Sequence, residues 1–419
     1  MATENKNYIP TLRFPEFQND GEWNYEYGNM LYDSIVNKKH KSDLPILAIT
    51  QDNGAIPRDE INYRVIVNDK SIEGYKIVEI GDFIISLRSF QGGIEYSRYK
   101  GLCSPAYIVL RKKHSKICDD FYRHYFKSFQ YIQALNRNLE GIRDGKMVSY
   151  KQFSDIKLPC PSLAEQKKIA DCLSSLDKYI DATKRKLELL KEHKKGLMQK
   201  LFPAKGKTLP ELRFPEFIGT KEWTPKQLGS IGETFGGLSG KSAEDFGTGK
   251  PFVTYKQVFN SSEIDFSECA LVQVSENEVQ NRLQYGDILV TTSSETPDEV
   301  GYTAVVTNKN IPKCYLNSFC FIYRLFDDES IDAKFLIYLF SSDAYRAAVV
   351  RIAQGITRFN ISKTKFKEIE LVIPEKKNEQ IKIAETLSSV DKQIAEYDKK
   401  IKAQELHKKG LMQQLFPKL

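Results

Sequence analysis

The stretch LRFPEF occupies residues 12–17 and occurs again, unchanged, at residues 212–217. In both copies a tryptophan follows six residues after the last Phe, and these two, Trp23 and Trp223, are the only tryptophans in the sequence. An identity of this length, at a fixed distance from the rarest residue type, indicates an internal duplication. The sequence therefore predicts a chain built from two related halves.

Similar segments follow both copies in the same order along the 419 residues. The separation between copies grows from 200 residues at the opening stretch to 214 at the end, so the second copy carries extra residues in its first two thirds. The ends match closely and the middles poorly, which predicts two modules that share a scaffold but differ where each contacts something else. The matching pairs are GDFIISLRS (81–89) with GDILVTTSS (286–294), FYRHYFKS (121–128) with FLIYLFSS (335–342), SYKQFSDIKL (149–158) with SKTKFKEIEL (362–371), AEQKKIADCLSSLDKYI (164–180) with NEQIKIAETLSSVDKQI (378–394), and HKKGLMQKLFP (193–203) with HKKGLMQQLFP (407–417).

The closing segment of each copy has a hydrophobic seam with alternating steps of four and three residues. Eight of its ten seam positions are apolar in each copy, and this pattern over five heptads is typical of a coiled coil. It predicts two helices, over roughly 164–201 and 378–415, each about 55–60 Å long. We expect the helices to pair with each other in antiparallel orientation, with one module at each end; pairing with another protein is the alternative. The residues predicted for helix pairing or partner docking are Ile169, Leu173, Leu176, Ile180, Leu187, Leu190, Leu197, Leu201, Ile383, Leu387, Val390, Ile394, Ile401, Leu411 and Leu415.

A module of about 150–160 residues precedes each helix and mixes short β-rich runs with one helix near its end, at about 119–140 and 331–354. Runs such as DFIISL and FCFIYRL are too irregular for a parallel doubly wound sheet. The predicted fold class is therefore α/β of the mixed α+β kind, with a curved, largely antiparallel sheet in each module. FPAKGKTLP (202–210) links the two halves.

The composition is that of an ordinary globular protein, with 41% hydrophobic and 28% charged residues. A net charge of +7 excludes a histone-like polycation but permits a local basic face. The N-terminus lacks a signal-peptide pattern and no apolar run is long enough to span a membrane, so we expect a cytoplasmic protein with no membrane partner. Seven scattered cysteines without C-x-x-C spacing favour neither a disulfide framework nor a zinc site.

Three patterns come near to an active site. FGGLSGKS (235–242) nearly matches the phosphate-binding P-loop pattern G-x-x-x-x-G-K-[ST], but Phe235 stands where the first glycine is required. If Gly236 is taken as that first glycine, the loop is one residue too short. Pro297–Asp298 with Asp332 and Lys334 form a loose carboxylate–lysine arrangement, and the helix dipole explains an acid at a helix start such as Asp332. The five histidines show no metal-ligand spacing, and the loops of a methyltransferase are absent from the sequence. We find no convincing catalytic or metal site.

Side chains of the kind that bond phosphates and base edges gather at two places in each module. One follows a β-rich run, and is basic and aromatic in module one but rich in hydroxyl groups in module two. The other is a Gly-initiated loop with an arginine in both modules, GIRDGKMVS (141–149) and GITRFNIS (355–362). A solvated polar loop is the alternative, but the repetition of the arginine favours DNA contact. The predicted DNA-contact residues are Arg88, Ser89, Gln91, Arg98, Lys100, Arg143, Lys146, Thr292, Ser293, Ser294, Thr296, Arg358 and Asn360.

The whole chain resembles the specificity subunits of type I restriction–modification systems. The resemblance rests on the paired LRFPEF openings with their tryptophans, the EQ.KIA..LSS.D starts of the helical segments and their HKKGLMQ.LFP ends. It implies a non-catalytic, DNA-binding subunit with target recognition domains at 1–161 and 204–375 and helical spacer regions at 162–203 and 376–419. Its implied partners are double-stranded DNA, two adenine-modifying subunits docked on the helices, and restriction subunits. S-adenosylmethionine, ATP and Mg²⁺ are expected on those partners, with no cofactor in this chain.

A duplicated reader can recognise a bipartite, asymmetric target. A symmetric dimer reads two identical half-sites about 34–36 Å apart. A single chain whose two halves have diverged keeps the approximate two-fold symmetry but can read two different half-sites. The helices are long enough to set such a spacing, so lengthening both by four residues should widen the tolerated spacer. Two alternatives stay open: a scaffold that binds protein, and a DNA-processing enzyme that uses the near-P-loop.

Overall fold

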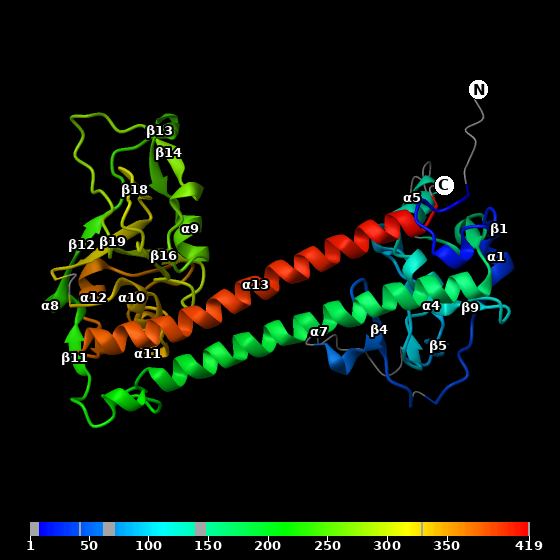
Figure 1. The fold of residues 1–419 in the computed structure, drawn as a ribbon, viewed down its shortest axis with the longest axis horizontal. Coiled ribbons are helices and arrows are strands. Elements are labelled where there is room, and N and C mark those ends of the chain that lie inside the picture. The colour runs from blue at the N-terminus through cyan, green and yellow to red at the C-terminus, as the bar shows by residue number, and fades with distance from the viewer. Residues whose placement is uncertain (1–7, 42, 62–71, 139–147, 328–329, 418–419) are drawn as a thin grey trace. The chain divides into compact units, whose positions relative to one another are not determined.

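The computed structural model describes residues 8–41, 43–61, 72–138, 148–327 and 330–417. The chain divides into two compact units, one formed by residues 1–185 with 398–419 and the other by residues 186–397. We call them unit one and unit two. Each contains one module together with part of each long helix (Figure 1).

The same antiparallel sheet forms the centre of both modules. Its strand order is β2-β9-β6-β7 in unit one and β12-β19-β15-β17 in unit two, and all neighbouring strands are antiparallel. The predicted mixed α+β class with a largely antiparallel sheet is therefore confirmed. The strands are β2 (Tyr32–Ile35), β9 (Ile108–Lys112), β6 (Phe83–Ile85), β7 (Glu95–Tyr96), β12 (Gly232–Gly236), β19 (Cys320–Leu325), β15 (Ile288–Thr291) and β17 (Thr303–Val305).

A second, two-stranded sheet joins the beginning of each module to its end. It pairs β1 (Asn24–Tyr27) with β10 (Lys157–Cys160) in unit one, and β11 (Thr224–Gln227) with β21 (Glu370–Ile373) in unit two. The last strand of each pair leads directly into a long helix. The short helices beside these strands also repeat: α1 (Gly28–Leu31) and α6 (Tyr150–Ser154) correspond to α8 (Leu228–Ile231) and α12 (Lys363–Lys367).

The prediction of one helix near the end of each module was wrong, because each is split into two. The pairs are α4 (Asp119–Tyr125) with α5 (Phe129–Arg137) and α10 (Ala333–Leu339) with α11 (Asp343–Ile352). Ser128 and Ser342 cause the break: each accepts a hydrogen bond from the backbone N–H three residues later, at 3.2 and 3.3 Å, and so begins a new helix.

The modules differ most in their smaller sheets. Among the residues that the structure describes, unit one has two two-stranded pairs, whereas unit two has a three-stranded sheet, a two-stranded pair and the short helix α9. The elements are β3 (Leu47–Thr50) with β4 (Gly54–Pro57), β5 (Lys76–Val78) with β8 (Gly101–Cys103), β14 (Ala270–Val272) with β13 (Phe246–Val253) and β18 (Tyr315–Leu316), β16 (Ser293–Ser294) with β20 (Phe359–Asn360), and α9 (Tyr255–Asn260).

The two long helices are α7 (Leu163–Leu201) and α13 (Lys377–Leu415), which agree with the predicted limits to within one residue. In unit one, Leu173 near the start of α7 shares a core with Leu415 at the end of α13. In unit two, Leu387 near the start of α13 shares a core with Leu201 at the end of α7. The helices are therefore antiparallel, as predicted, and lie side by side within each unit (Figure 1).

Candidate nucleic-acid interface

The repeated LRFPEF stretch joins a module to both long helices. In unit one, the guanidinium of Arg13 donates two hydrogen bonds to Glu165 on α7, at 2.7 and 2.8 Å. In unit two, Arg213 makes the same pair with Glu379 on α13 at the same distances. The backbone N–H of the preceding residue donates to the end of the opposite helix, from Leu12 to the carbonyl of Gln414 at 3.0 Å and from Leu212 to that of Lys200 at 2.8 Å. Each copy therefore fastens the start of one helix beside the end of the other.

The other repeated polar residues also hold the scaffold. Gln166 and Gln380, which follow these glutamates, each bond backbone groups at the start of a module helix and at the preceding proline. The aspartates of the two GD pairs, Asp82 and Asp287, are buried and accept two-pronged hydrogen bonds from Arg111 and Arg324. Burial raises the pKa of Asp287, and the arginine beside it opposes that shift. The sequence signal for all these pairs was present in the repeat, but one sequence does not show which charges meet.

All fifteen residues predicted for the helix seam are buried or half-buried: eleven are buried, and Leu176, Leu197, Ile394 and Leu411 are half-buried. Four seam positions hold polar residues instead, and each of these contacts the opposite helix: Thr183, Lys194, Gln404 and Lys408. Gln404 donates to Thr183 at 3.4 Å. Lys408 pairs with Asp177 in unit one, and Lys194 pairs with Asp391 at 2.6 Å in unit two.

The predicted contact residues of unit two come together around β16 and β20. Ser293 and Ser294 pair with Asn360 and Phe359, and the backbone groups of Gln354 and Asn360 exchange hydrogen bonds at 2.8 and 2.9 Å. These bonds close the loop that presents the exposed side chain of Arg358. Gly355 begins the loop with a φ of 139°, and a Cβ there would lie 2.0 Å from the carbonyl oxygen of Arg358, so only glycine fits.

The polar side chains of this loop region differ in whether they face solvent or bond groups within the protein. Thr292 donates to the carbonyl of Phe319 at 2.7 Å and is half-buried, and Ser294 is buried with its hydroxyl on Glu299 at 3.1 Å. Thr296 is exposed, and Asn360 is exposed with its amide 3.3 Å from the carbonyl of Arg358. Arg358, Asn360 and Thr296 are thus the predicted residues whose side chains face solvent. The structure also exposes Phe319 and Ile356, at 58% and 96%, which the sequence analysis did not single out.

The predicted residues of unit one begin at Arg88, the N-cap of α3 (Ser89–Gly92), and continue on and after that helix. The side chains of Arg88, Gln91 and Arg98 are exposed, and Lys100 forms an exposed ion pair with Glu79 at 3.0 Å. Ser89 is buried and its hydroxyl accepts a hydrogen bond from the N–H of Ser86 at 2.8 Å, so it supports the turn from inside. Arg143 and Lys146 lie outside the described residues.

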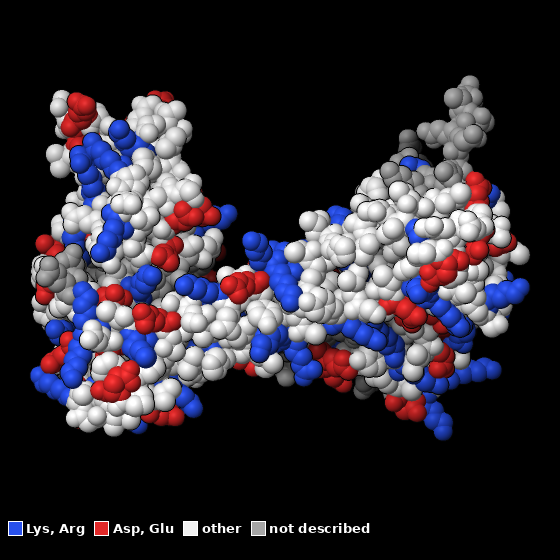
Figure 2. Space-filling view, in the orientation of Figure 1, with Lys and Arg blue, Asp and Glu red and all other residues white. Residues whose placement is uncertain are grey.

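On the face that Figure 2 shows, Lys and Arg are interspersed with Asp and Glu. The near-P-loop and the carboxylate–lysine arrangement, which partly resembled active-site motifs, contribute residues with structural roles. Lys241 of the near-P-loop pairs with Glu278 at 2.6 Å, and Asp332 caps α10 by accepting from the N–H of Phe335 at 2.9 Å. Within the described residues, no three His, Cys, Asp or Glu side chains are placed to hold a metal ion.

Comparison with known proteins decides the family. The family described as "Type I restriction modification DNA specificity domain" matches residues 14–192 and 220–405, which is one match in each half and most of the chain. The chain belongs to this family. It is a DNA-specificity component of a type I restriction–modification system and not a catalytic one, and its partners are DNA and the methyltransferase and restriction subunits of that system.

Individual specificity subunits are similar over most of the chain. The type I restriction enzyme MjaVIII specificity subunit of Methanocaldococcus jannaschii is 28% identical over 353 residues, which cover 80% of this chain and 78% of that protein. The solved S subunit of M. genitalium shares the fold with a TM-score of 0.55 at 16% identity, over 98% of this chain and all of that one. A chain from a study of assembly and conformational transition of the type I R-M system gives a TM-score of 0.56 at 18% identity, over 94% and 96%. Among the described residues, no helix of this specificity protein has the length and apolar character to cross a membrane.

Proposed function

We propose that this specificity protein reads a bipartite, asymmetric DNA target, with one half-site bound by each module. The observation that supports this most strongly is the contrast between scaffold and loops. The Arg–Glu, Asp–Arg and Asp–Lys pairs repeat residue for residue. In contrast, Arg88 just before α3 and Gln91 on it correspond in unit two to the hydroxyl-rich strand around Ser293. Two readers with one scaffold and different contact groups suit two different half-sites.

The long helices act in this proposal as the spacer between the readers. Each has 39 residues and so is about 58 Å long at 1.5 Å per residue, which exceeds one turn of duplex DNA. We further propose that two modification subunits, which methylate adenine, dock on the helices, and that restriction subunits join them in the cytoplasm. S-adenosylmethionine, ATP and Mg²⁺ would then be bound by those subunits.

In unit two, Arg358 makes the phosphate or base contact. We expect Arg358→Ala to weaken binding of target duplex by the complex with its modification subunits by about tenfold, and to lower the dependence of affinity on salt, because a contact of this kind contributes about 1–3 kcal/mol. Arg351→Ala is the matched control, since Arg351 is also exposed but lines a pocket beside the linker residues Lys205 and Lys207. Equal affinities for the two variants would contradict the assignment, and a salt-independent affinity would favour a protein-binding scaffold.

A further inference from the structure

One carboxylate occupies the same place in both long helices. Asp177 lies 14 residues after Leu163, the first residue of α7, and Asp391 lies 14 residues after Lys377, the first residue of α13. Each is paired with a lysine on the opposite helix: Lys408 in unit one and Lys194 in unit two. The two residues that the long helices contribute to this contact, an aspartate and a lysine, are therefore the same in both units.

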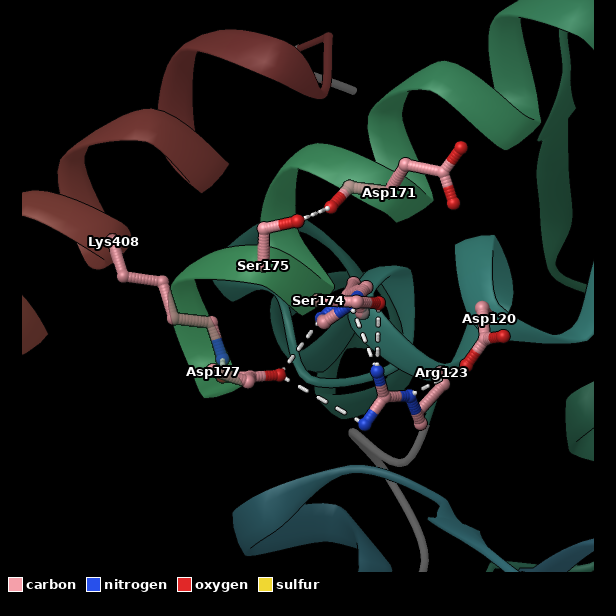
Figure 3. Close-up of polar contacts among 8 residues, drawn as sticks. Asp120, Arg123, Asp171, Ser174, Ser175, Asp177 and Lys408 are labelled. Carbon is pink, nitrogen blue, oxygen red and sulfur yellow. Dashed lines mark hydrogen bonds and ion pairs between the residues drawn. The ribbon is translucent and has the colours of Figure 1, made fainter. Parts of the chain in front are cut away.

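A third element, the module itself, reaches the same carboxylate in unit one (Figure 3). Arg123 of α4 donates to Ser174 at 2.9 Å and lies 3.8 Å from a carboxylate oxygen of Asp177. His124 lies 3.1 Å from the hydroxyl of Ser174 through one ring nitrogen and 3.8 Å from Asp177 through the other. A single turn of α7 thus contacts the module helix and the opposite spacer helix together.

In unit two a phenol makes the corresponding contact. Tyr338 of α10 donates to Asp391 at 2.9 Å, and the ammonium of Lys194 lies 5.6 Å from the centre of its ring. Tyr338 and His124 hold the same position in the aligned segments FLIYLFSS and FYRHYFKS, and Ile337 stands where unit one has Arg123. The aspartate and the lysine are thus the same in both copies, while the module-side partner has changed with the module.

We propose that these two junctions, formed by Asp177 with Ser174, Arg123 and His124, and by Asp391 with Tyr338, are positioning sites that fix the angle of each module on the helix pair, and thereby the number of base pairs tolerated between the half-sites. The inference rests on the proposed reading of a bipartite target. A module that tilts about this contact displaces its reading loops along the DNA, where one base pair corresponds to about 3.4 Å. In unit one the module is held to α7 by the hydrogen bonds of Arg123 and His124 to Ser174, beside the Asp177–Lys408 pair. In unit two it is held to α13 by the hydrogen bond of Tyr338 to Asp391. These contacts resist a tilt because any tilt lengthens them, and a hydrogen bond weakens as it lengthens.

Tyr338→Phe removes only the junction hydroxyl in unit two, and Tyr345→Phe is its matched control. The hydroxyl of Tyr345 donates to the carbonyl of Gly301 at 2.8 Å, and both tyrosines are buried in the same unit, but this second bond lies within the module. We would express each variant with the partner subunits and map methylated adenine across the genome. We expect Tyr338→Phe to raise several-fold the methylation of sites whose spacer differs by one base pair, with Tyr345→Phe retaining the wild-type spacer.

Unit one offers a second pair of variants on neighbouring residues. Ser174 bonds Arg123 and His124, whereas Ser175 bonds the carbonyl of Asp171 at 2.7 Å on the same helix (Figure 3). We expect Ser174→Ala to relax the spacer and Ser175→Ala to leave it unchanged. These alanine variants keep the test decisive even if Tyr338→Phe reduces the yield of folded protein.

The outcomes separate this inference from the function on which it rests. A wild-type split motif whose spacer stays sharp in Tyr338→Phe and Ser174→Ala would overturn the positioning role alone. Equal broadening by the junction variants and their controls would also overturn it, because general destabilisation would then be the cause. A wild-type map with no split motif dependent on this chain would overturn the proposed function and the inference together.

Discussion

The imidazole of His124 is enclosed at the junction of unit one, with only 3% of its surface exposed. Burial, followed by the positive charges of Arg123, Lys408 and Arg98, lowers its pKa to about 2. The ring is therefore neutral in the folded protein, whereas in the unfolded chain it takes up a proton below a pH of about 6.5. Acid should consequently weaken the folded state through this residue.

The effect of His124 on stability has a definite direction. Because the unfolded chain binds the proton and the folded chain does not, this contribution is fully present above pH 6.5 and is lost as the pH falls below it, by up to about 1.4 kcal/mol per pH unit. We expect the wild type to lose about 1 kcal/mol more than His124→Tyr, which carries the unit-two residue, when denaturant unfolding is compared at pH 7.5 and 5.5. Equal losses for the two proteins would contradict the buried neutral state.

Among the contacts between elements, we expect the largest contribution to stability from the pairs that join each LRFPEF stretch to a long helix, Arg13 with Glu165 and Arg213 with Glu379. We call each of these pairs a clamp. The side chains of Arg213 and Glu379 are 10% and 2% exposed, and Trp223 adds a hydrogen bond to the same carboxylate at 3.1 Å. Removing the arginine leaves a buried carboxylate without its cation, which is far more costly than losing a pair in water.

Arg213→Ala should therefore lower the free energy of unfolding of the transition that involves unit two by about 3 kcal/mol, measured by chemical denaturation. Lys221→Ala is the control, because the side chains of the Lys221–Glu375 ion pair are 75% and 41% exposed and water screens such a pair, so its loss should change stability little. A loss in Arg213→Ala no larger than in the control would show that the clamp does not hold the helix ends together.

Sequence patterns predicted the elements unequally. The heptad seam located α7 and α13 to within one residue, because the pattern is local and extends over many turns. The split of each module helix was missed, since the capping roles of Ser128 and Ser342 depend on how the chain turns there. The strand order was beyond reach because β2 pairs with β9 across more than seventy residues of sequence.

The candidate site could be predicted only in part, because the sequence does not show which partner each side chain meets in the fold. The loops with Arg88 and Arg358 are exposed, as a contact surface requires, but Ser89 and Ser294 proved to be buried groups that support turns. Residue type and position in a loop cannot distinguish a hydroxyl that faces solvent from one that bonds its own backbone. Arg13, Asp177 and Tyr338 were missed because their partners are far away in the sequence.

At the scale of the whole molecule, the duplication repeats an entire set of contacts and changes the exposed loops. Each unit has its own sheet, its own clamp and its own junction to a long helix. A protein that must present two different readers on one scaffold needs this combination. We therefore expect this chain alone to decide where its partner subunits modify DNA.

The most direct test is a genome-wide map of methylated adenine in cells with this chain and its modification partner, compared with cells that lack only this chain. We predict a split motif, with two unlike half-sites and a fixed spacer, that disappears completely when the chain is absent. A map that is unchanged by its removal would contradict the account, because methylation would then be directed by something else.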